Sequence, residues 1–337
     1  MNNYLIFFTF LFLNLFISFF YKEFSKYINI YDHPNSSRKI HKIKTPVFGG
    51  IIYFINFSFY FLLNFFLPDY YALPFFNSFF QNYIFYIISS LIFFLGIYDD
   101  KKNITPKIKF ILLSFLISIY LIIDNQYFIT EIRFSFYEKI IFLKNFSFFF
   151  TLLCFLLFLN ACNMFDGINL QSGIYFFTIY FYFFIISSFN PFFLMCLLTI
   201  AFIIFLNYNG KIFIGDGGIY LFSFVGSSIF IKLYNFNDIK FSDQIFIFMM
   251  FPGFDLLRLF IYRIYKKKNP FKADNKHIHH LLINKFGFLK TIFIIFLLIT
   301  FPILVSFYSL LNNLFIIIVS LIVYLALLIY THYKNYI

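Results

Sequence analysis

Long apolar stretches alternate with short polar segments along almost the whole chain. The hydrocarbon core of a bilayer is about 30 Å thick and needs about 20 apolar residues per helix. On that scale the sequence predicts eleven transmembrane helices, at residues 4–21, 47–67, 81–98, 108–124, 145–163, 172–188, 191–207, 217–234, 243–264, 290–310 and 313–332. Only Phe189 and Asn190 separate the sixth stretch from the seventh, and Pro191 opens the latter, so a tight helical hairpin is predicted there.

Composition supports a membrane protein. Hydrophobic residues occupy 62% of the 337 positions, charged residues only 12%, and the mean hydropathy is +0.85. No soluble core uses that much apolar surface. The expected fold class is therefore all-α, a polytopic integral membrane protein with a single membrane-embedded domain over residues 1–337. The net charge of +12 does not call for a nucleic-acid partner, because in a membrane protein it sets the orientation and attracts anionic lipid or phosphate.

The distribution of basic residues predicts the orientation. If the eleven stretches cross the membrane in turn, 21 of the 26 lysines and arginines lie on one side. Basic connections remain in the cytoplasm, so this side is predicted to be cytoplasmic, with the N-terminus outside. The apolar run Tyr4–Tyr21 has neither a preceding basic residue nor a following small-residue cleavage site, which favours a retained helix over a signal peptide. The three cysteines lack CxxC spacing, so we expect buried thiols without a disulfide.

The longest polar window runs from Pro252 to Leu282, and we expect the chemistry here. It carries Arg263 and three of the six histidines, which are His277, His279 and His280. Asp255 and Arg258 are three residues apart and could simply pair within a helix. The histidines alone could form a zinc site. However, no cysteine accompanies them, and imidazoles beside arginine and lysine suit a pyrophosphate better.

Two polar islands precede the middle of the chain on the predicted cytoplasmic side. The first contains Arg38 and His41 and ends in a glycine pair, Gly49 and Gly50, that lets a backbone or ligand approach closely. Taken alone, this island is explained more simply as a basic loop with a flexible helix start. The second contains Asp99 and Asp100, followed by lysines up to Lys109. Adjacent carboxylates with lysines suit a metal-bound phosphate, although a solvated helix end is the alternative.

Two more islands lie farther along the chain on the same side. Asn160, Asn163 and Asp166 are spaced by three, so they share one face of a helix end. Polar groups at this depth face a ligand, a cavity or another helix, and a structural hydrogen bond between helices is the simpler alternative. Asp216 stands among glycines at the start of a span, where it could bind a metal or cap the helix.

Taken together and in this order, the islands resemble one family, the polyprenyl-phosphate N-acetylhexosamine-1-phosphate transferases of glycosyltransferase family 4. The resemblance covers residues 32–282. It rests on five motifs, which are Arg38…His41…Pro46…Gly49-Gly50, Asp99-Asp100…Lys109, Asn160…Asn163…Asp166-Gly167, Gly215-Asp216 and Asp274…His277-Ile278-His279-His280. The last motif looks like the branch that initiates O-antigen, enterobacterial common antigen or teichoic-acid linkage synthesis.

The resemblance implies a reaction and its partners. An N-acetylhexosamine-1-phosphate would pass from a UDP-sugar to undecaprenyl or another polyprenyl phosphate, releasing UMP, in the bacterial inner membrane with the active site on the cytoplasmic face. Mg²⁺, or Mn²⁺ in its place, would be the cofactor. A homodimer is left open.

The resemblance also implies residue roles. Asn163 and Asp216 would bind the metal. Asp99 and Asp100 would orient or deprotonate the lipid phosphate, and Lys109 would hold a phosphate. The three histidines would grip the diphosphate. The remaining residues would contact substrate, with Asp166 near the nucleotide, and these are Arg38, His41, Gly49, Gly50, Asn160, Asp166 and Arg263.

The chain departs from the family pattern at two places. Asn169-Leu170-Gln171 replaces a second Asp/Asn-Gly pair, and Ile219 replaces a serine after the Gly-Asp motif. Both departures bear on nucleotide or sugar specificity. A secondary transporter of an anionic solute and a non-catalytic scaffold are the competing interpretations. A transporter needs polar residues at mid-membrane, whereas the predicted spans contain mostly phenylalanine, isoleucine and leucine away from their cytoplasmic ends.

Overall fold

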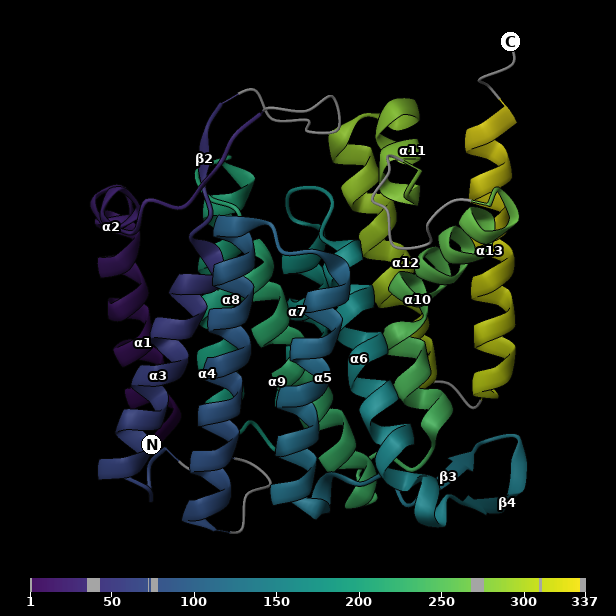
Figure 1. Cartoon of the computed structure of the whole chain (residues 1–337), viewed down its shortest axis with the longest axis horizontal. Coiled ribbons are helices and arrows are strands. Elements are labelled where there is room, and N and C mark those ends of the chain that lie inside the picture. Colours follow the sequence, from purple (N-terminus) through teal and green to yellow (C-terminus); the bar gives the residue numbers. More distant parts are fainter. Residues whose placement is uncertain are drawn as a thin grey trace.

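The computed structural model describes residues 2–34, 43–71, 73, 78–267, 276–308 and 311–333, and the chain is an all-α polytopic membrane protein. Its helices, labelled in Figure 1, are α1 (Asn2–Phe19), α2 (Tyr21–Ile28), α3 (Gly49–Phe66), α4 (Phe79–Lys102), α5 (Pro106–Ile123), α6 (Ser147–Phe165), α7 (Gln171–Ile186), α8 (Pro191–Tyr208), α9 (Gly215–Asn235), α10 (Ser242–Tyr265), α11 (Ile278–Phe286), α12 (Phe288–Tyr308) and α13 (Asn313–Tyr333).

Each of the eleven predicted spans coincides with one helix. Within the described ranges, nine helices are long and apolar enough to cross a membrane. The two remaining spans differ. α1 is followed by α2 after a bend of 66°, so the pair is a broken span or a re-entrant loop, and α7 is an apolar helix of only 16 residues. The polytopic all-α fold is confirmed, while the number of crossings stays a prediction.

α9 occupies the centre of the bundle. Its apolar window is completely buried, and α3, α4, α6 and α7 contact it. Small residues allow this because helix backbones in a membrane approach closely where side chains are short. A Cβ placed on Gly50 of α3 would lie 2.5 Å from the Cα of Gly218, and one on Gly96 of α4 would lie 2.5 Å from the Cα of Gly217. The first turn of α9 is thus held between two helices at backbone contact.

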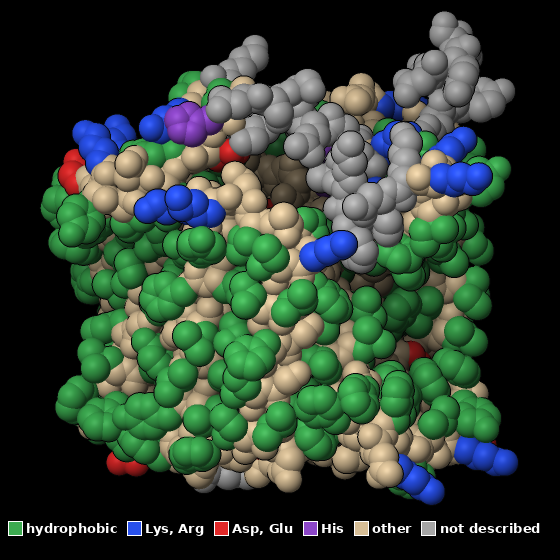
Figure 2. All heavy atoms as spheres, in the orientation of Figure 1, with side chains coloured by type: hydrophobic (Ala, Val, Ile, Leu, Met, Phe, Trp, Pro, Cys, Tyr) green, Lys and Arg blue, Asp and Glu red, His purple; other side chains and the backbone are tan. Residues whose placement is uncertain are grey.

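The two ends of the bundle differ in character. α2, β2 and α11 lie at one end in Figure 1, called here the site end, and β3 and β4 lie at the other. Figure 2 shows a hydrophobic belt between the ends, with lysines and arginines gathered above and below it and a hollow at the site end. This grouping agrees with the alternation of predicted spans, because the connections that carry the motifs emerge together.

Several elements were not predicted. The short helices α2 and α11 and four strands lie in connections, and the strands form two antiparallel pairs. They are β1 (Tyr31–Asp32) with β2 (Thr45–Pro46), and β3 (Glu131–Phe134) with β4 (Tyr137–Phe142). Pro252 lies inside α10, where it removes a helical hydrogen bond. Beyond the lower part of α10, Figure 1 shows the helix leaning toward α13.

Candidate active site

The glycine pair after β2 packs directly on the start of α9. The amide of Gly49 donates to the carbonyl oxygen of Phe213 (2.8 Å), and that of Gly50 donates to Ile214 (2.8 Å). Phe213 in turn donates to Pro46 (2.9 Å). Two islands far apart in the sequence therefore form one backbone-bonded unit. Close backbone approach explains why glycine stands at position 50, and contact of either glycine with substrate stays a prediction.

Asp100 caps α9 from a neighbouring helix. Its Oδ1 accepts a hydrogen bond from the amide of Asp216 (2.9 Å), and its Oδ2 accepts one from Gly217 (3.1 Å). These amides have no partner within their own helix, and a carboxylate there also interacts favourably with the helix dipole. The alternative that Asp216 caps α9 is therefore wrong. Asp100 does so, and the carboxylate of Asp216 is left for other partners.

Lys109 of α5 links the other two carboxylates. Its ammonium group forms ion pairs with Asp99, which is only 2% exposed, and with Asp216, at 3.2 Å from Oδ2. Asp99 also accepts a hydrogen bond from the amide of Ile104 at 2.8 Å. Two carboxylates thus share one ammonium group, while the third, Asp100, is bonded to amides of α9. Buried negative charge in excess of its counter-charge is costly, so this cluster is suited to a further cation.

α6 contributes amides and a carboxylate beside this cluster. Asn163 donates to the hydroxyl of Tyr220 on α9 (3.0 Å), and Asn160 donates to the carbonyl of Leu156 (2.7 Å). The structural hydrogen bond between helices considered for this island is therefore present at Asn163, whose amide oxygen is still available as a ligand. Asp166 ends α6, and burial raises the pKa of its carboxyl group to about 6.

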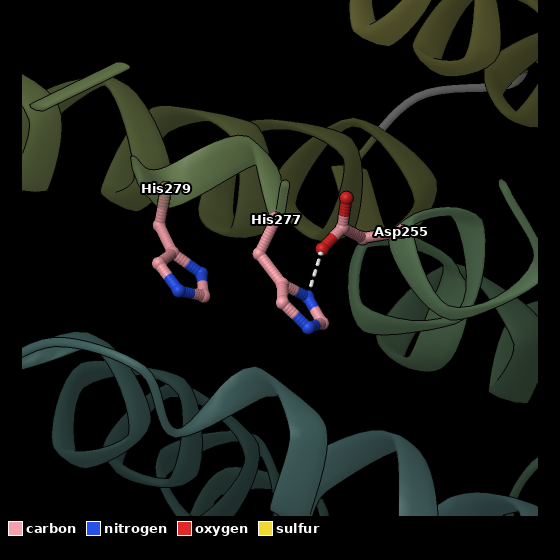
Figure 3. Close-up of side chains that lie close together, drawn as sticks. All are labelled: Asp255, His277 and His279. Carbon is pink, nitrogen blue, oxygen red and sulfur yellow. Dashed lines mark hydrogen bonds and ion pairs between the residues drawn. The ribbon is translucent and has the colours of Figure 1, made fainter. Parts of the chain in front are cut away.

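His277 is held by a buried carboxylate. Its Nδ1 lies 2.7 Å from Oδ2 of Asp255, as Figure 3 shows. Oδ1 of Asp255 accepts from Arg258 (2.7 Å) and from the hydroxyl of Tyr324 on α13 (2.9 Å). The pairing of Asp255 with Arg258 considered from the sequence is confirmed, but the same carboxylate also anchors the histidine motif at the start of α11.

His279 contacts the loop after α6. A Cβ at Gly167 would overlap its ring, which explains the glycine there. Its Nδ1 lies 3.4 Å from Nε2 of Gln171, and within the described chain its buried Nε2 has no hydrogen-bond partner. Burial, with His280 and His277 nearby, lowers the pKa of His279 well below its ordinary value. If Gln171 donates to Nδ1, the neutral ring carries its proton on Nε2, which could serve an oxygen acceptor.

The remaining predicted residues have the following positions. Arg38, His41 and Asp274 lie outside the described residues. Arg263 is buried on α10, and the ring of His280 lies 4.4 Å from that of His279 between centroids. Motif-based prediction missed Tyr220, Gln171 and Tyr324. No local signal marks these three, because each becomes a partner only through packing of distant helices.

Two groups of side chains could hold a metal ion. Ligand atoms of Asp255, His277 and His279 all lie within 4.8 Å of one another. However, the guanidinium group of Arg258 already forms an ion pair with the carboxylate of Asp255, and a bound cation would compete with this guanidinium group. The carboxylate cluster around Lys109 and the amide oxygen of Asn163 offer oxygen ligands and excess negative charge, which is the donor set Mg²⁺ prefers. The residues therefore fit magnesium better than they fit zinc.

Comparison with known proteins gives a family match. Residues 82–234 match glycosyl transferase family 4. The chain is 28% identical over 276 residues to the undecaprenyl-phosphate alpha-N-acetylglucosaminyl 1-phosphate transferase of Thermotoga maritima, covering 81% of this chain and 79% of that protein. It is 26% identical over 286 residues to the protein of the same description in Escherichia coli K12, covering 81% and 74%.

Proposed function

We propose that this chain, whose residues 82–234 match glycosyl transferase family 4, is a member of that family and transfers N-acetylglucosamine 1-phosphate from UDP-N-acetylglucosamine to undecaprenyl phosphate. The relatives of that description cover most of the chain and support the proposal. The observation that carries it is structural. A carboxylate–lysine cluster, whose Lys109 and Asp216 are 107 residues apart in the sequence, and a pair of buried imidazoles occur at one end of a transmembrane bundle.

The reaction needs little covalent chemistry from the protein. An oxygen of the lipid phosphate attacks the β-phosphorus of the donor, the bond from that phosphorus to the bridging oxygen breaks, and UMP leaves. A phosphate monoester has a second pKa of about 6, so the nucleophile is already largely ionised at neutral pH. The protein must therefore position two anions in line and neutralise their charge.

The carboxylate–lysine cluster is suited to the phosphate oxygens. Asp216 and Asn163 would hold Mg²⁺, which when bound neutralises diphosphate charge. Lys109 would contact a phosphate oxygen once its bond to Asp216 is exchanged for one to substrate. Asp99 orients Lys109, and Asp100 keeps the start of α9 in place. In this assignment Asp100 acts on the scaffold, and Asp99 is the acid nearest to the lipid phosphate.

The histidines would bind the donor. His277 and His279 stack with centroids 5.3 Å apart and nearly parallel planes, and both rings point the same way from α11 in Figure 3. Two imidazoles in this arrangement can donate to neighbouring oxygens of a diphosphate. Asp166, at the end of α6, would accept a hydrogen bond from the nucleotide. The protein would lie in a bacterial inner membrane with its site end on the cytoplasmic face. The product would there initiate the synthesis of a cell-surface polysaccharide.

The proposal is tested by assaying purified protein in proteoliposomes with undecaprenyl phosphate and a panel of UDP-sugars. We expect UMP release that requires both the lipid phosphate and Mg²⁺, with the highest turnover for UDP-N-acetylglucosamine. A different preferred sugar would correct the donor alone. Absence of UMP release with every donor, together with counterflow of an anionic solute, would replace the transferase by a transporter.

A further inference from the structure

A buried network behind His277 has no part in the reaction as described so far. It joins three elements, because Asp255 and Arg258 lie on α10, His277 immediately precedes α11, and Tyr324 lies on α13. Asp255 and Tyr324 are 3% and 2% exposed, and both are deep enough that unsatisfied polar groups would be costly. The network therefore has to be fully bonded, and its geometry determines what His277 can do.

Asp255 uses its full capacity as an acceptor. It accepts from Nδ1 of His277 (2.7 Å), from Arg258 (2.7 Å), from Tyr324 (2.9 Å) and from the amide of Ile278 (3.2 Å). An ionised carboxylate offers about four such sites and donates none. The proton between Asp255 and His277 therefore belongs to Nδ1. This fixes the ring orientation and leaves Nε2 as the nitrogen that can meet a ligand.

The hydroxyl of Tyr324 completes the same network from the last helix. It donates to Asp255 and accepts from Nε of Arg258 at 2.9 Å, so it holds the carboxylate and its counter-ion in one arrangement. Its ring packs against Phe251 and Phe254 of α10. α13 also contacts α11 directly, through Tyr330 and Lys285. The last helix thus braces the segment that carries the histidines.

We infer that Asp255 and Tyr324 are positioning residues for His277, and that they hold Nε2 toward the diphosphate of the donor. This inference rests on the proposed function for the identity of the ligand, but the ring geometry it describes does not. With Nδ1–H bonded to Asp255, the doubly protonated ring presents Nε2–H as a donor to a phosphate oxygen. The role of Tyr324 is to keep the carboxylate of Asp255 from rotating away from His277.

The first test measures directly which ring nitrogen of His277 carries the proton, and it needs no substrate. In protein labelled with ¹⁵N-histidine, the resonances of His277 are identified by their loss in His277→Gln. We expect Nδ1 protonated in the wild type and a population with the proton on Nε2 in Asp255→Asn. An unchanged His277 spectrum in Asp255→Asn would overturn the inference. Lack of turnover with every donor would refute the proposed function while leaving this spectrum as expected.

The second test is a double-mutant cycle. Tyr324→Phe removes one buried hydroxyl and keeps the ring, and we expect about a tenfold lower kcat with UDP-N-acetylglucosamine. In a His277→Ala background the same substitution should cost less than about twofold, because Tyr324 acts only through His277. Tyr330→Phe on the same helix is the matched control and should leave kcat unchanged.

The outcomes separate positioning from a purely structural role. A Tyr324→Phe protein with the wild-type melting temperature and a loss that disappears without His277 supports the inference. An equal loss in both backgrounds, an equal loss in Tyr330→Phe, or no loss at all overturns it. If Tyr324→Phe lowers the melting temperature, the decision passes to the ¹⁵N spectrum of the same variant at a temperature where it is folded. A wild-type His277 signal there contradicts the role.

Discussion

Asp99 and Asp100 are adjacent in sequence but have different partners. Asp100 binds two amides of α9, whereas Asp99 binds Lys109 and a local amide. Adjacent residues on a helix point about 100° apart, so one can meet α9 while the other meets α5. The pair therefore fixes the start of α9 and presents Lys109 and Asp216 beside each other. The acid with the fewest structural partners is Asp216.

Asp216→Asn tests the metal assignment. The substitution keeps size but removes the charge that a divalent cation needs, so we expect at least a hundredfold lower kcat and a higher Mg²⁺ requirement, with the protein still inserted. Asp238→Asn, at an exposed position beyond the opposite end of α9, is the control and should behave as wild type. Near-normal turnover of Asp216→Asn at low Mg²⁺ would show that Asp216 is not a ligand.

Asp166 predicts a pH dependence of donor binding. Its pKa is raised to about 6 by burial, so it gains a proton as the pH falls through that value and then no longer accepts as a carboxylate. We expect the affinity for UDP-N-acetylglucosamine, measured without lipid phosphate, to fall relative to that of Asp166→Asn as the pH drops from 7.5 to 5. A constant ratio of the two affinities across this range would argue against contact of Asp166 with the donor.

Sequence reasoning identified polar residues that gather at the site end, but it did not predict their partners. Carboxylates, lysines and histidines stand out in a chain that is only 12% charged. In contrast, Tyr220 and Tyr324 are two of 27 tyrosines in apolar helices, and only folding shows that they bind Asn163 and Asp255. Likewise, the sequence could not reveal that Asp100 rather than Asp216 caps α9, because the two lie on different helices.

At the scale of elements, α9 is the part on which the site is built. Its first turn carries Asp216 and contacts α3 and α4 where glycines allow the backbones to meet. A helix held in this way cannot shift without moving the carboxylates, so the close packing also preorganises the site. The glycine pair in the first island was predicted to allow close approach, and the approaching group is the backbone of α9.

Gly50→Ala tests this packing. The added methyl group would lie 2.5 Å from the Cα of Gly218, and backbone cannot yield as a flexible side chain does, so we expect a loss of about 1–3 kcal/mol in stability. Gly253→Ala is the matched control. Nothing lies within 4 Å of its Cβ, and alanine favours the helix. A wild-type melting temperature with reduced activity in Gly50→Ala would indicate substrate contact in place of packing.

Long helices could be predicted and short elements could not. A membrane span needs so many apolar residues that its length alone is a signal. α2 and α11 have 8 and 9 residues, too few to show a reliable period, and β4 exposes all six of its residues, so it has no alternating pattern. The position of α11 depends instead on the hydrogen bond between Asp255 and His277, which are 22 residues apart in the sequence.

At the scale of the whole molecule, the candidate site residues gather at one end of the helix bundle. Described residues of all five motifs lie at the site end, while the opposite end carries the β3–β4 hairpin, which is bonded to α9 and α10 through Tyr234 and Asp243. All three cysteines are free, but only Cys162 and Cys196 are buried as predicted, because Cys154 is partly exposed. In the proposed reaction, a bundle of this kind would give the lipid substrate access from the bilayer and the nucleotide access from one aqueous side.

Cysteine labelling tests the orientation. In a background with the three native cysteines replaced, a membrane-impermeant maleimide added to intact cells should label Lys139→Cys in β4. It should label Lys102→Cys at the end of α4 only after the cells are opened, because basic connections remain in the cytoplasm. Labelling of Lys102→Cys from outside would invert the predicted orientation or change the number of crossings.

The central claim is that phosphate and sugar move together, and a doubly labelled donor tests it most directly. UDP-N-acetylglucosamine carrying ³H in the sugar and ³²P at the β-phosphorus is incubated with the protein, undecaprenyl phosphate and Mg²⁺. We predict both labels in the lipid fraction in a 1:1 ratio, with an equal amount of unlabelled UMP released. Tritium alone in the lipid, with ³²P retained in UDP, would mean that only the sugar is transferred and would contradict the proposed reaction.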